Sequence, residues 1–142
     1  MRYVCDAPGG ATWFRIETEA EADAEAALMR HAVDNYFRSS AEAAREIYRA
    51  PPGMASFEQE IGLKDHIARS MPIFLTLRAD DGTGLATAML PPGGRKAPRL
   101  KPLIVGPRNS DPYERHAAAI AALAAHFKLE LEREVCFPYK LG

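Results

Sequence analysis

Cysteine is scarce in this sequence, and its scarcity indicates in which cellular compartment the protein is found. Cys5 and Cys136 are the only two among 142 residues, whereas a small secreted domain usually carries several cysteines spaced as a disulfide framework. Residues 1–10 contain no apolar run and include the acid Asp6, so we expect no signal peptide. The sequence therefore predicts a cytoplasmic protein with reduced thiols. Frequent alanine and an excess of arginine over lysine suit a GC-rich bacterial genome.

Long apolar runs and an excess of one charge are also missing. The longest apolar run, residues 117–125, is about half the length of a membrane-spanning helix and is mostly alanine, so we expect no membrane segment. The formal net charge is −1, whereas a dedicated nucleic-acid binder usually carries a marked positive excess. The overall charge therefore does not favour nucleic acid as a partner.

The chain also lacks the motifs of familiar catalytic, nucleotide and metal sites. It contains neither GxGxxG nor GxxxxGK[ST], which cradle phosphates, nor the nucleophile motif GxSxG. Its histidines form no HExxH motif and no i, i+4 pair on a predicted helix: His31, His66, His116 and His126. We therefore predict no metal site and no cofactor, and we name no catalytic residue. Sites assembled from distant positions leave no local pattern, so enzymatic activity stays an open question.

Alternation of period two and turn residues predict the first two strands. They span Arg2–Asp6 and residues 11–18, and the Pro-Gly-Gly stretch within residues 7–10 joins them. A helix is expected to begin at Thr18, which has capping-box spacing with Glu21. The acids at the start of this helix complement its dipole and are expected to lie in solvent: Glu19, Glu21, Asp23 and Glu25.

An apolar stripe at helical spacing continues from Met29 to Tyr48, and we interpret it as core. Because the stripe stays in phase, it favours one long helix over residues 19–50, either straight or kinked. A second capping box, formed by Ser39 and Glu42, leaves two helices as the alternative.

The middle of the chain predicts a short helix and then a hairpin. Ser56 and Gln59 have capping-box spacing, and the helix that follows is expected to turn three apolar side chains inward: Phe57, Ile61 and Ile67. Residues 72–78 and 85–90 read as two strands, because a turn rich in aspartate and glycine separates them.

The last third predicts a brief strand at residues 103–105, a helix and a final strand. Asp111 is the expected helix cap, with Pro112 at the first helical position and Glu114 completing the box. Residues 129–137 then alternate apolar and acidic side chains, which indicates a half-exposed strand.

These elements fit an ordinary globular domain. Apolar residues make up 47% and charged residues 26% of the chain, and its length suits one domain with its own core. We predict a single α+β domain over residues 1–142, with element order ββ-α-α-βββ-α-β. The sheet is expected to be mixed or antiparallel, with about five to six strands and helices against one face.

The strongest local charge asymmetry lies in residues 82–110, which contain no acid and five bases: Arg95, Lys96, Arg99, Lys101 and Arg108. Arg108 lies just before the predicted N-terminus of the last helix, where free backbone N–H groups favour an anion. We therefore name five candidate residues for binding a phosphate or carboxylate: Arg108, Asn109, Ser110, Arg95 and Lys96. The alternative is a solvated loop in which Asp111 itself satisfies the helix end.

Three functions remain open at this point. The absence of motifs favours a non-enzymatic binding or assembly module that self-associates, through an exposed edge strand or the long helix. The second is an enzyme or sensor for a small anionic metabolite near Arg108, with His66 or His116 as proton carrier. The third is a nucleic-acid accessory protein, which the lack of aromatic residues between Arg95 and Arg108 does not favour.

Overall fold

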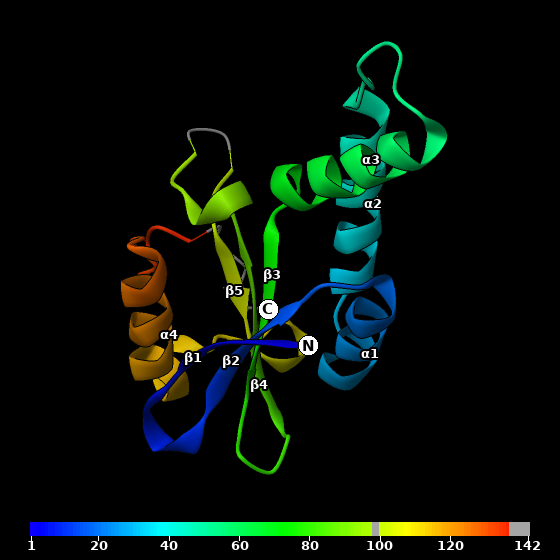
Figure 1. Ribbon diagram of the computed structural model, residues 1–142. Helices are drawn as coiled ribbons and strands as arrows, with labels where there is room; N and C mark the ends of the chain where they lie inside the picture. The colour runs from blue at the N-terminus through cyan, green and yellow to red at the C-terminus, as the bar shows by residue number, and fades with distance from the viewer. Residues whose placement is uncertain (98–99, 137–142) are drawn as a thin grey trace.

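The computed structural model describes residues 1–97 and 100–136 (Figure 1). These residues form one α+β domain around an antiparallel sheet with five strands: β1 (Arg2–Asp6), β2 (Thr12–Ile16), β3 (Ile73–Arg78), β4 (Gly84–Leu90) and β5 (Leu103–Val105). The strands lie side by side in chain order, and each neighbouring pair is antiparallel. The predicted fold class is confirmed, and so are the two N-terminal strands and the hairpin.

Four α-helices are present in the described part of the chain. Between β2 and β3 lie α1 (Glu19–Met29), α2 (Val33–Ile47) and α3 (Ser56–Ser70), whereas α4 (Tyr113–Phe127) follows β5. Short 3₁₀ turns occur between the elements: η1 (Pro8–Gly10), η2 (Pro92–Gly94) and η3 (Pro107–Asn109).

The helices cover both faces of the sheet, not one face as we expected (Figure 1). Leu75 and Trp13 face α4, and Trp13 Nε1 donates a hydrogen bond to Ala119 O at 2.8 Å. Ile16 and Phe74 face the other way and pack with α1 and α2. Because successive side chains of β3 alternate between the faces and nearly all are buried, this strand needs cover on both sides.

The predicted single helix over residues 19–50 is wrong, because it is divided into α1 and α2. Arg30 ends α1 in the left-handed conformation, with φ 55° and ψ 55°. The N–H groups of Arg30 and His31 both bond to Ala26 O, which closes the helix end. The break does not fall at Ser39, which lies inside α2. The stripe is core only in part: Val33, Phe37 and Ala44 are buried in the core that α1 shares, whereas Tyr36 and Ile47 are exposed.

Helix α3 begins at Ser56 as predicted, but the capping box with Gln59 is absent. Instead, Gln59 Nε2 donates to Met54 O at 2.9 Å. Phe57 and Ile61 were expected to point inward, yet both are exposed. Ile67, nearer the end of the helix, is half-buried and packs against the core as expected. The inner side of α3 otherwise meets α2, so Phe57 and Ile61 reach no core.

The predicted strand over residues 129–137 is not formed in its described part, residues 129–136, and Phe137 lies outside the described residues. The N–H groups of Val135 and Cys136 both bond to Glu132 O, which makes a turn. Tyr113 Oη donates to Leu131 O at 2.6 Å. A side chain of α4 therefore satisfies a backbone carbonyl that a strand partner would otherwise bond.

The position of the helix break predicts whether a glycine substitution stabilises or destabilises the fold. Arg30→Gly is expected to raise the free energy of unfolding by roughly 0.5–1 kcal/mol, because glycine adopts the left-handed region without steric cost. The same change at Arg45, inside α2, is expected to lower it by about 1 kcal/mol. Urea unfolding of both variants measures the difference, and a destabilised Arg30→Gly would favour the continuous helix instead.

Candidate functional site

A fully buried carboxylate lies at the centre of the face that α1 covers. Glu25 of α1 has an exposure of 0%. Arg78 Nη2 donates to its Oε1 at 2.6 Å, and Thr87 Oγ1 donates to its Oε2 at 2.5 Å. A buried carboxylate without partners would cost several kcal/mol of desolvation free energy, about the range known for unpaired ions. Here each oxygen has its own donor.

The guanidinium of Arg78 is itself fixed by the β3–β4 hairpin. Its Nε donates to Thr76 Oγ1 at 3.0 Å, and its Nη1 donates to Gly82 O at 3.4 Å. The cation therefore cannot follow α1 if that helix moves. The ion pair joins α1 to one position on the sheet.

His31, in the turn between α1 and α2, extends this network. Its Nε2 lies 2.8 Å from Thr87 Oγ1. Because the only proton of that hydroxyl goes to Glu25, the oxygen accepts from His31 Nε2–H. The neutral ring then leaves Nδ1 to accept from Val33 N, at 3.4 Å. Burial lowers the pKa of His31, although the carboxylates of Glu25 and Asp34 oppose this shift.

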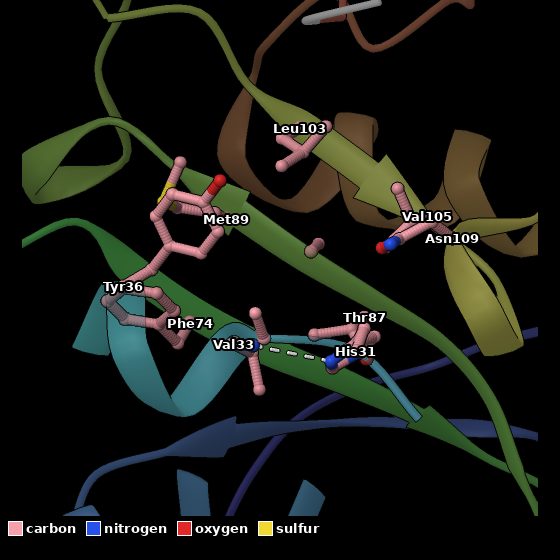
Figure 2. Close-up of a pocket in the computed structure, with 11 residues that line it drawn as sticks. His31, Val33, Tyr36, Phe74, Thr87, Met89, Leu103, Val105 and Asn109 are labelled. Atoms are coloured by element: carbon pink, nitrogen blue, oxygen red, sulfur yellow. Dashed lines mark hydrogen bonds between the residues drawn. The ribbon is translucent and has the colours of Figure 1, made fainter. Parts of the chain in front are cut away.

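The network ends at a small cavity, where His31 and Thr87 lie side by side and Tyr36 and Asn109 approach from other elements (Figure 2). The rest of the lining is apolar: Ala32, Val33, Phe74, Ala88, Met89, Leu103 and Val105. Its volume of about 40 Å³ has room for a few water molecules. Metabolite pockets are roughly ten times larger, so we interpret this network as a device that positions α1 and α2.

Sequence reasoning missed this network because it assigned Glu25 to the solvated acids of α1. Glu19 and Asp23 do lie at the surface, where Arg38 Nη1 reaches them at 3.5 and 2.7 Å. Glu25 is instead four residues from Met29, and both side chains are buried. That i, i+4 spacing to an apolar residue was the available signal.

The anion candidates before α4 lie beside a cavity of about 420 Å³. Ser110, Arg115 and His116 line this cavity, whereas Arg108 is exposed and outside its lining. Arg108 and Asn109 are both left-handed, with φ 57° and 59°.

The N-terminus of α4 already holds a carboxylate of the chain. The predicted cap is shifted by one residue: Pro112, expected at the first helical position, is the N-cap, and no capping box with Glu114 is formed. Asp111 precedes the cap, where its Oδ1 accepts from Tyr113 N at 2.8 Å and its Oδ2 is paired with Arg133. This negative charge occupies the place where an anion would bind.

Lys96 lies at a different cavity, of about 340 Å³, between its loop and the other end of α4. The neighbouring Arg95 is exposed and is not in that lining. Asn109 contributes to the His31 cavity. The structure thus does not gather the five candidates around one cavity, since they lie near both ends of a helix that is about 22 Å long.

Comparison with models of known protein families, with curated proteins and with solved structures finds no match to this chain. Within residues 1–97 and 100–136, no helix has the length and apolar character needed to cross a membrane. Nor does that part of the chain group three or more His, Cys, Asp or Glu side chains so that they could hold a metal ion.

The buried ion pair predicts a large effect from a nearly isosteric change. Glu25→Gln is expected to lower the free energy of unfolding by about 3 kcal/mol, because it leaves the Arg78 guanidinium without its counter-charge. Glu19→Gln, on the exposed side of the same helix, serves as control and is expected to unfold like the wild type. Urea unfolding measures the stability of both variants. Equal stabilities would contradict the proposal that the Glu25–Arg78 ion pair holds α1 on the sheet.

The depressed pKa of His31 predicts a pH dependence. Below the unfolded value of about 6.5, the unfolded chain binds a proton that the folded chain does not. The free energy of unfolding therefore falls as the pH drops from 6.5 toward the folded pKa, by up to about 1.4 kcal/mol per pH unit. His31→Gln keeps a donor for Thr87 and is expected to flatten this slope. Thermal or urea unfolding between pH 7.5 and 5.5 measures this dependence. If His31→Gln left the slope of unfolding free energy against pH unchanged, the depressed pKa of His31 would be refuted as its cause.

Proposed function

We propose that the protein is a non-enzymatic binding module that self-associates through the outer face of α3. The supporting observation is that this 15-residue helix has no fully buried side chain. Two of its large apolar side chains, Phe57 and Ile61, are 65% and 57% exposed. Helices of globular proteins owe most of their stability to a buried apolar face, so two large apolar side chains exposed on one helix favour a partner that covers them.

The inner side of α3 is already used by α2. Gly62 lies so close to Tyr48 Oη that a Cβ there would clash. The rings of His66 and Tyr48 stand 5.1 Å apart, and His66 Nε2 bonds to Ala44 O at 3.0 Å. At 100° per residue, Phe57 points well away from the azimuth of Gly62. The apolar side chains Phe57 and Ile61 therefore face outward.

The charges along α3 favour a second copy of this chain as the partner. Glu58 and Glu60 lie in its first half, whereas the second half carries the cations Lys64 and Arg69 together with one acid, Asp65. Two copies packed antiparallel about a two-fold axis near the middle of the helix would place each Glu60 opposite a Lys64. Such a pairing is self-complementary, as a two-fold interface requires.

The edge strands, our other expected interface, are less suited to pairing. β5 has three residues, and β1 has a register shift between Tyr3 and Cys5. Short and bulged edges are the usual means by which proteins discourage strand addition.

Light scattering after size exclusion tests the proposal. At several hundred micromolar, the mass is expected to approach twice the 15.6 kDa of the chain. The double variant Phe57→Ser with Ile61→Ser is expected to stay monomeric, because it removes the apolar contact. Tyr3→Ser, an exposed aromatic on β1, is the control and should associate like the wild type.

A charge swap separates this interface from unspecific association. Lys64→Glu is expected to weaken the dimer, and Glu60→Lys in the same chain is expected to restore it. A wild-type chain that is monomeric at these concentrations, or a double serine variant that still dimerises, would overturn the proposal.

A further inference from the structure

The cavity between the basic loop and the C-terminal end of α4 combines cations with an apolar floor. Lys96 and Lys101 come from the loop, and Lys128 directly follows α4. Glu130 is the acid in the lining, and the remaining residues are apolar: Pro91, Ala97, Leu100, Pro102, Leu129 and Val135. We infer that this cavity binds a small amphipathic anion, with a carboxylate, phosphate or sulfate head and a compact apolar body.

The net charge of the lining determines the sign of the charge that a ligand should carry. Three lysines against Glu130 leave two positive charges among the described residues of the cavity. The C-terminal end of the helix dipole opposes an anion, but it amounts to about half of one negative charge. Lysine ammonium groups act as mobile point charges rather than as a planar fork. They therefore select for charge and tolerate different anionic heads.

The apolar floor of the cavity favours an apolar body for the remainder of the ligand. Pro91 is buried, and Leu129 and Val135 are half-buried, so the bottom is apolar and largely fixed by the fold. A bare inorganic ion would leave this surface in contact with water. An apolar body would cover it and gain roughly 25 cal/mol for each Å² removed from water.

The volume and the charge distribution favour this cavity over the His31 cavity and the cavity at the start of α4. About 340 Å³ lies at the lower end of the range of small-molecule pockets, whereas the His31 cavity is far below it. The cavity at the start of α4 is somewhat larger, but there the charge of Asp111 offsets that of Arg115, so neutral His116 leaves the lining without a positive excess. The lysine-lined cavity, in contrast, brings together three separate cations, of which Lys128 is distant in sequence.

Octanoate is a suitable probe, because it pairs a carboxylate with an apolar body of seven carbons. Calorimetric titration in low salt is expected to detect octanoate binding. Octanamide, the neutral analogue, is expected to bind at least tenfold more weakly, and acetate to give no heat. Raising sodium chloride should weaken octanoate binding, because exposed charges are screened. Absence of octanoate binding, or equal binding of octanamide, would overturn the inference.

Matched variants locate the site. Lys101→Gln and Lys128→Gln are each expected to weaken octanoate binding about threefold, the size of an exposed charge contact. Arg95→Gln removes the same charge from the same loop outside the lining, and its affinity is expected to equal that of the wild type. Glu130→Gln is expected to tighten binding, a gain that a damaged fold would not produce. The proposed site would be refuted if Arg95→Gln lowered the octanoate affinity as much as Lys101→Gln does. It would also be refuted if Glu130→Gln lowered that affinity.

Discussion

The ion pair of Glu25 and Arg78 fixes the position of everything on one face of the sheet. Helix α1 is rich in alanine, so its apolar burial alone specifies its place only weakly. The paired charges can be satisfied in one arrangement, since Arg78 is held by its own hairpin. The desolvation cost of such a pair nearly cancels its Coulombic gain, so its main effect is to select one geometry. Through Thr87 and His31 the same network sets where α2 begins.

The two faces of the sheet differ in how they are covered. On one face, α4 and the segment after it lie directly on the strands, and Trp13 joins the layers. On the other face, α1 and α2 form the layer, and α3 packs mainly on α2. The candidate surfaces follow from this asymmetry: the exposed outer face of α3 on one side, and on the other a loop with lysines beside the end of α4.

What could be predicted from the sequence is what depends on neighbours in the chain. The β3–β4 hairpin follows from alternation and a glycine turn, and the Thr18 capping box is present as expected. The helix break at Arg30, in contrast, comes with a bond from the next residue to Thr87, a partner 56 residues away. The burial of Glu25 likewise depends on Arg78, and the place of Lys128 beside the basic loop depends on the path of α4. No local pattern carries such information.

The insertion of α1, α2 and α3 between two paired strands has a consequence for the order of folding. The β3–β4 pairing closes a turn of a few residues, whereas pairing β2 with β3 closes a loop over residues 17–72. Loop entropy makes the longer closure costlier by about 2 kcal/mol. The hairpin therefore has the lower entropic barrier, and β1 and β2, although synthesised first, join a sheet that the middle of the chain can begin alone.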